Sequence, residues 1–163
     1  LAAADPARRA LYRRNARAYL RRLRRLDAGI ARCIAAVAPA RRKLVTDHEA
    51  LGAFARRYGL RIVGAVVPAR APAAQPSARD VRELIELIER ERAPALFPEH
   101  GSRAGVAAAI ARESGVALGR PLYGDSLGPP GSGAETYLTM EAANADAIVR
   151  GLTAGRRGCR PLR

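Results

Sequence analysis

Residues 43–67 read KLVTDHEALGAFARRYGLRIVGAVV, and they contain two short apolar segments with a helical segment between them. Residues 43–46 predict a short strand. Residues 61–67 predict a buried strand, because their apolar side chains do not alternate with polar ones. The helical segment runs to Tyr58 and stops at Gly59, a residue type that commonly ends helices. A strand, a helix and a second strand in this order are typical of a parallel sheet.

The alternation of strands and helices continues toward the C-terminus. Residues 68–76 are rich in proline and predict a loop, after which Ser77 and Asp80 predict the capped start of a helix. Further strands are expected at residues 95–98 and 116–123, and further helices at 102–113 and 134–152. Repeating units of roughly 30 residues predict an α/β fold, a three-layer αβα lobe with a mostly parallel sheet of about four strands.

Residues 5–37, upstream of the first strand, predict one long helix. Asp5 followed by Pro6 is a favourable helix start, and Pro39 marks the end. Apolar or small residues recur with a period close to 3.6, and nine arginines between positions 8 and 25 occupy most of the remaining surface. Such a run of charge is typical of a solvated helix face.

The composition narrows the function classes. The 163 residues fit one domain with a real core, and their formal charge of +14 comes almost entirely from arginine. A module that binds polyanions or nucleic acid through the Arg-rich first helix is therefore kept as an alternative function. Aromatic residues make up only 4% of the chain, which disfavours a surface that stacks single-stranded bases. Cys33 and Cys159 lack metal-finger spacing, and both free thiols and a disulfide remain open.

Polar residues follow three of the predicted strands, at the edge of a parallel sheet where ligands collect. The loops after Thr46, Phe97 and Tyr123 contain Asp47, His48, Glu49, Glu99, His100, Asp125 and Ser126. A histidine and a carboxylate that converge from different loops suit Zn²⁺ or Mn²⁺. Isolated residues of these types also cap helices or face solvent, so the spacing by itself leaves both interpretations open.

No enzyme is expected. The chain has no G-x-S-x-G nucleophile motif, and the glycine-rich residues 128–133 lack the lysine of a phosphate-binding loop. Asp47 and Glu49 are interpreted as helix-capping residues rather than as a catalytic pair. A metal-dependent hydrolase built on Asp47, His48 and Asp125 would need a general base that the sequence does not identify.

An ordered set of motifs resembles the zinc/manganese ABC-transporter solute-binding family (ZnuA/TroA-like). Residues 45–60, VTDHEALGAFARRYGL, are similar to its VTxHxAxGYFAxRYGL block. Residues 95–99, 122–128 and 136–140 are similar to its IFxE strand, its LYxDSLG turn and its closing TYLxMMxxN helix, which also matches Asn144. Asp5-Pro6, Tyr12, Asn15-Ala16 and Leu26-Asp27 resemble the helix that joins the two lobes in that family.

The resemblance implies a clamp of two lobes with a metal ion between them, held by two side chains from each lobe. The matching ligands here are His48 and Asp125. Glu99 matches an acidic residue of the family that lies near the metal without being assigned as a ligand, and His100 is incidental. Residues 1–40 would be the inter-lobe connecting helix and residues 41–155 the C-terminal metal-binding lobe. Residues 156–163 would be a frayed basic tail. The N-terminal lobe with its two histidine ligands is expected to be absent, since Leu1 reads as the interior of a longer protein.

The same resemblance implies the partners and the location. The chain would be part of an extracytoplasmic receptor, in the periplasm or at the cell surface, whose signal peptide lies outside this sequence. Its cargo would be Zn²⁺ or Mn²⁺, and its partner the permease of an ABC importer. No nucleic acid is expected, and the membrane would be reached only through the transporter or a missing lipid anchor. A monomer is expected. Binding would need a neutral imidazole and would weaken in acid.

Overall fold

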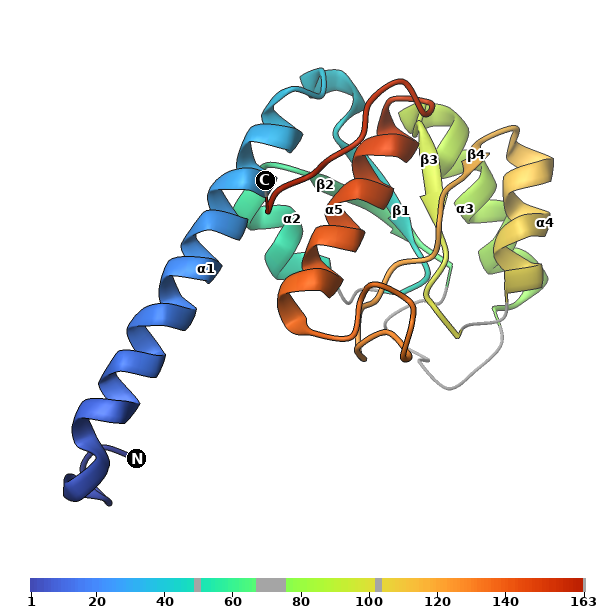
Figure 1. Ribbon diagram of the computed structural model, residues 1–163. Coiled ribbons are helices and arrows are strands. Elements are labelled where there is room, and N and C mark those ends of the chain that lie inside the picture. Colours follow the sequence, from blue (N-terminus) through green and yellow to red (C-terminus); the bar gives the residue numbers. More distant parts are fainter. Residues whose placement is uncertain (49–50, 67–75, 102–103, 163) are drawn as a thin grey trace.

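The computed structural model describes residues 1–48, 51–66, 76–101 and 104–162. The short 3-10 helix η1 (Pro6–Arg8) leads into α1 (Arg9–Ala35), and η2 (Pro39–Arg41) leads into the lobe (Figure 1). The lobe then alternates strands and helices as β1 (Lys43–Thr46), α2 (Gly52–Tyr58), β2 (Arg61–Ala65), α3 (Ala78–Glu91), β3 (Ala95–Phe97), α4 (Ala104–Ser114), β4 (Ala117–Leu118) and α5 (Tyr137–Leu152).

The four strands form one sheet in the order β2-β1-β3-β4, with parallel pairing between all neighbours. The α/β fold and the parallel sheet predicted from the sequence are confirmed. The expected strand at residues 116–123 is wrong in length, because pairing stops at Leu118 and resumes only as a single bridge between Leu122 and Glu99. Pro121 lies in this interval, and a proline has no N–H to donate to a neighbouring strand.

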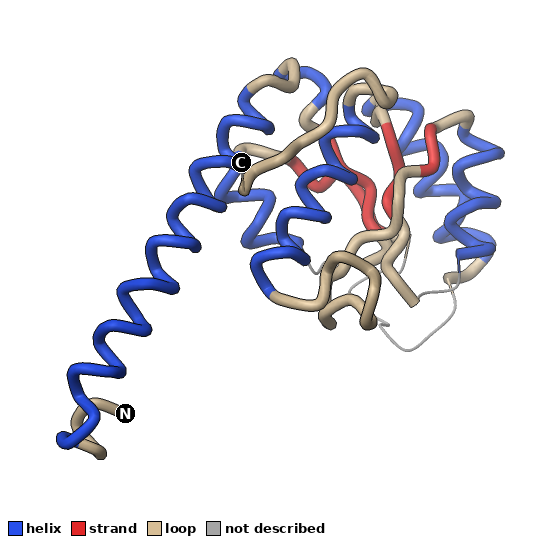
Figure 2. Tube along the Cα trace, in the orientation of Figure 1, coloured by secondary structure: helices blue, strands red, loops and turns tan. Residues whose placement is uncertain are grey.

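Helices cover both faces of the sheet, as the tube in Figure 2 shows. On one face Leu44 and Phe97 pack with buried residues of α1 and α5. On the other face Val45 and Leu96 pack with buried residues of α3 and α4. Side chains of a strand point alternately to opposite faces, so the adjacent apolar residues of β1 and of β3 contribute to both cores.

The helix ends follow local capping. At α3, Ser77 Oγ accepts a hydrogen bond from the Asp80 N–H, and the Asp80 carboxylate accepts one from the Ser77 N–H, as predicted. The last helix was predicted to begin at residue 134, but it begins at Tyr137, because Thr136 is the N-cap and accepts a hydrogen bond from Thr139. Three internal segments lie outside the described residues: 49–50, 67–75 and 102–103. They include most of the loop predicted at residues 68–76 and the start of the helix predicted at residues 102–113.

Only the C-terminal part of α1 belongs to the core. Its buried residues begin at Leu26 and continue through Ile30 and Ile34, whereas the N-terminal half projects away from the lobe (Figure 1). Leu11 and Tyr19 are exposed. In the described part of the chain, none of the helices has the length and apolar content that a membrane crossing requires.

The chain end after α5 returns to α1, so the prediction of a frayed tail is wrong for residues 156–162. Cys159 is buried and forms a disulfide with Cys33 of α1, which settles the question that the sequence left open. The Cys159 N–H donates to Asp146 Oδ1 at 2.8 Å. Gly29 lies so close to the tail that a Cβ placed on it would be 2.1 Å from the Pro161 carbonyl oxygen. The disulfide and the close packing at Gly29 hold the tail on α1, and the hydrogen bond to Asp146 holds it on α5.

Candidate metal centre

The register of the sheet brings the predicted site residues together. Thr46 at the end of β1 is paired with Phe97 at the end of β3. His48 and Glu99 each follow these partners by two residues, and Glu99 is itself bridged to Leu122, three residues before Asp125. The three predicted site residues therefore lie at the same, carboxyl edge of the parallel sheet.

The imidazole of His48 lies between two carboxylates. Its Nδ1 is 2.8 Å from Glu99 Oε2, and its Nε2 is 3.2 Å from Asp125 Oδ2. Two ligand atoms bound to one tetrahedral Zn²⁺ at about 2.0–2.1 Å lie about 3.3 Å apart. The separation of Nε2 and Oδ2 is therefore suited to joint coordination of one cation, while Nδ1 faces the carboxylate of Glu99.

Glu99 is fully engaged by the protein. Its Oε1 accepts hydrogen bonds from the N–H groups of Gly124 and Asp125, at 2.9 and 3.1 Å, and its Oε2 faces the His48 ring. One carboxylate thus fixes both the histidine and the backbone of the turn that carries Asp125. A carboxylate on the second nitrogen of a metal-binding histidine sets its tautomer and orientation, which fits a supporting role for Glu99.

Two further residues hold the loops. Thr46, which is buried, donates its hydroxyl to the His48 carbonyl at 2.8 Å. Asn144 of α5, also buried, accepts from the Tyr123 N–H at 2.9 Å and donates to the Tyr123 carbonyl at 2.8 Å. Asn144 matches the closing motif of the family, but the motif predicted no role for it. An asparagine among the apolar residues of the last helix was the signal, because a buried amide needs partners.

The other residues that the sequence placed near the site differ in whether they lie in the cluster. Asp47 contributes a carboxylate oxygen within 4.8 Å of donor atoms of His48 and Glu99, so it belongs to the cluster. Leu51 is the N-cap of α2, so Asp47 does not occupy that position. His100 stacks on the Tyr123 ring with centroids 4.7 Å apart. Ser126 is exposed and forms no hydrogen bond with the described residues of the cluster, and Glu49 lies outside the described residues.

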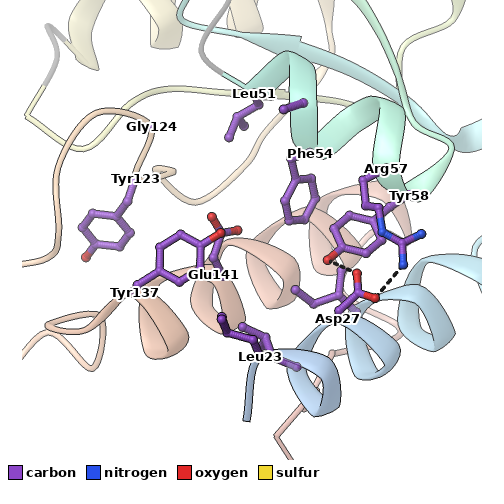
Figure 3. Close-up of a pocket in the computed structure, with 13 residues that line it drawn as sticks. Leu23, Asp27, Leu51, Phe54, Arg57, Tyr58, Tyr123, Gly124, Tyr137 and Glu141 are labelled. Carbon is purple, nitrogen blue, oxygen red and sulfur yellow. Dashed lines mark hydrogen bonds and ion pairs between the residues drawn. The ribbon is translucent and has the colours of Figure 1, made fainter. Parts of the chain in front are cut away.

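A groove of about 400 Å³ lies between α1, α2, α5 and the turn at Gly124 (Figure 3). At one end of the groove, Asp27 accepts hydrogen bonds from Arg57 and from the Tyr58 hydroxyl. Burial, with this hydrogen bond, raises the pKa of Tyr58. Burial also raises the pKa of Glu141, and a hydrogen bond from Tyr137 opposes that shift. Leu51 and Gly124 line both the groove and the small depression at His48, so the two spaces adjoin.

Comparison with known proteins identifies the lineage of this fold and site. The sequence profile of the family described as zinc-uptake complex component A, periplasmic (ZnuA) matches residues 1–151. The chain belongs to the ZnuA family. The resemblance inferred from the motifs is confirmed.

Several relatives of this ZnuA-family chain are named as metal-binding proteins. Zinc-binding protein TroA of Treponema pallidum is 35% identical over 140 residues, covering 83% of this chain and 45% of TroA. Iron-binding protein YfeA of Yersinia pestis is 31% identical, covering 90% of this chain and 47% of YfeA. The solved structure of TroA superposes with a TM-score of 0.79 at 31% identity, covering 93% of this chain and 56% of that structure. The chain spans about half the length of the curated relatives that it matches.

Glu99→Gln tests the supporting role of that carboxylate within the ZnuA-family chain. The amide keeps one oxygen for the turn but removes the negative charge that faces His48, so Zn²⁺ affinity should fall about tenfold. The expected measurement is a calorimetric titration. Glu113→Gln on the exposed surface of α4 is the control and should leave the affinity unchanged. An unchanged affinity in Glu99→Gln would contradict the role assigned to this residue.

Proposed function

We propose that the chain is the metal-binding C-terminal lobe, with its connecting helix, of a solute-binding receptor that delivers a metal ion to an ABC importer. The observation that carries the proposal is the pair of His48 Nε2 and Asp125 Oδ2, 3.2 Å apart, with Glu99 on the opposite ring nitrogen. Membership of the ZnuA family supports it, since the relatives are named as metal-binding proteins.

The described ligand set is incomplete. The Asp125 side chain is 75% exposed and that of His48 33% exposed, so both donors are accessible from outside the lobe. Two donors leave at least two positions of a tetrahedral ion to other groups. We propose that residues 1–40 connect this lobe to a second lobe that supplies those groups and covers the groove. This chain by itself should bind the ion weakly.

The cargo we propose is Zn²⁺ or Mn²⁺. An imidazole nitrogen suits both metals, and a carboxylate oxygen favours Mn²⁺ while also binding Zn²⁺. The name of YfeA adds Fe²⁺ as a third candidate, because the same donors accept iron. The family comparison gives no support to the alternative of a nucleic-acid-binding module.

The proposed partners and location follow from the same assignment. We propose a monomer that meets the permease of an importer outside the cytoplasm, with no enzymatic activity of its own. The Cys33–Cys159 disulfide supports an oxidising compartment, because such bonds form and persist outside the reducing cytosol.

Calorimetric titration with Zn²⁺ and Mn²⁺ tests the proposal, on this chain and on a version extended by the N-terminal lobe of a relative. The extended version should bind much more tightly. His48→Ala and Asp125→Ala should each weaken its binding by about a hundredfold, because each removes one ligand of the ion. His100→Ala is the matched control, since that histidine stacks on Tyr123 and should leave the affinity intact.

Equal affinity of the His48→Ala, Asp125→Ala and unsubstituted proteins would refute the ligand assignment. Loss of affinity in His100→Ala together with retention in His48→Ala would transfer the site to the other histidine.

A further inference from the structure

The positive charge of the chain is concentrated in its first quarter. Residues 1–42 contain twelve arginines and two aspartates, a net charge of +10 out of the +14 of the whole chain. The remaining residues carry 17 basic and 13 acidic side chains and are nearly balanced. A general preference for arginine in the composition would not separate the charge in this way, so α1 itself requires an explanation.

Most of the arginines of α1 lie on one side of the helix. At 100° per residue, Arg13, Arg17, Arg21 and Arg24 fall within one narrow arc, and all four are exposed. We call these four residues the arginine stripe. The centre of the stripe lies roughly 140° around the helix from that of Leu26, Ile30 and Ile34, which face the core of the lobe. Any domain that continues the apolar packing along α1 would therefore leave the stripe open.

The stripe carries charge without internal compensation. Among the described residues, the ion pair nearest the stripe joins Arg8 and Asp5, just before α1, and none of the four stripe guanidiniums forms an ion pair. Arg9, Arg13, Arg14, Arg17 and Arg21 together line a hollow along the helix. Like charges spaced at i and i+4 repel one another, so an external array of negative charge would relieve the repulsion.

We propose that the arginine stripe docks on an anionic phospholipid surface. The stripe runs straight for about 17 Å along a helix that stands clear of the lobe, which suits a flat array of phosphates (Figure 1). Guanidinium groups bind phosphate through paired hydrogen bonds. The aromatic residues of α1, Tyr12 and Tyr19, lie on the opposite side from the stripe, which disfavours a surface for stacking bases.

The Cys33–Cys159 disulfide also supports an anionic membrane as the partner of the stripe. Disulfides persist in the periplasm and at the cell surface, and a protein in either place lies next to a membrane. Polybasic segments gain affinity for anionic membranes with each added charge, within about 10 Å of the surface at moderate salt. None of these observations involves His48, Glu99 or Asp125, so membrane binding by the stripe is independent of the metal site.

Cosedimentation with lipid vesicles tests the proposal on the 163-residue chain. Vesicles with equal parts of phosphatidylcholine and phosphatidylglycerol should bind it, vesicles of phosphatidylcholine alone should not, and added salt should release it. Replacing the stripe with glutamine (R13Q/R17Q/R21Q/R24Q) should weaken binding at least tenfold. A control with the same loss of charge on exposed positions elsewhere in the lobe should bind nearly as well: R82Q/R90Q/R112Q/R156Q.

Circular dichroism of both variants should show the helix content of the unsubstituted chain, since glutamine and arginine have similar helix propensities. The affinity of the stripe variant for Zn²⁺ should be unchanged, which separates this proposal from that of the metal site. Equal loss of vesicle binding in the two variants would overturn the stripe as the contact surface. Tighter binding to duplex DNA than to the anionic vesicles, at one ionic strength, would overturn the choice of lipid.

Discussion

Replacing Cys33 with serine should lower the free energy of unfolding by about 4–5 kcal/mol, because the Cys33–Cys159 bond closes a loop of 126 residues in sequence separation. A long cross-linked loop removes much of the conformational freedom of the unfolded chain, which raises the stability of the folded chain. Urea denaturation followed by circular dichroism measures the difference. Cys159→Ser and the double variant should show the same loss, since each removes the same bond.

Two controls test whether the loss of stability comes from the disulfide itself. Reducing the unsubstituted chain should reproduce the stability of the double variant, and further reduction of that variant should change nothing. Ala36→Ser introduces a serine at an exposed position just beyond α1 and should leave the stability unchanged. A double variant as stable as the oxidised chain would show that the bond does not restrain the unfolded state.

Asn144→Ala should lower the free energy of unfolding by about 3 kcal/mol. The substitution removes two hydrogen bonds and leaves the N–H and carbonyl of Tyr123 without their partner, and a buried unpaired group costs about 1–3 kcal/mol. Urea denaturation measures the change. Metal affinity of the extended receptor should fall as well, because Asn144 anchors the turn that carries Asp125.

Asn15→Ala is the matched control, because Asn15 is an exposed asparagine on the projecting half of α1. It should alter stability by less than about 0.5 kcal/mol. If Asn144→Ala and Asn15→Ala were equally stable, the anchoring role of Asn144 would be wrong.

Local sequence signals predicted much of the lobe. β1 matches its predicted bounds because four residues of strand character end at the polar Asp47. α3 begins at its predicted cap because Ser77 and Asp80 satisfy each other's backbone groups without help from the rest of the fold. β4 was predicted too long. The strand ends at Leu118, directly before Gly119, which packs so closely that an added Cβ would be 2.4 Å from the Phe97 ring. Such a contact forms only in the tertiary structure, so the local sequence could not predict it.

The candidate site divides in the same way. The convergence of His48, Glu99 and Asp125 was predictable, because residues that follow parallel strands meet at one edge of a sheet. The tie between Asn144 and Tyr123 was not, because its partner is a backbone that any residue would provide. The Cys33–Cys159 bond joins two distant segments, and neither its spacing nor its surrounding residues carried a signal for the pairing.

The close approach of Gly29 to Pro161 has a mechanical consequence for α1. From Arg9 to Leu26 the helix extends about 25 Å beyond its first buried residue, so a tilt of about 5° at its base would move its tip by about 2 Å. The tail packs on the base of this lever at Gly29 and is bonded to it one turn further on, at Cys33. The last residues of the chain therefore help to fix the base of α1, and through it the direction in which the first residues project.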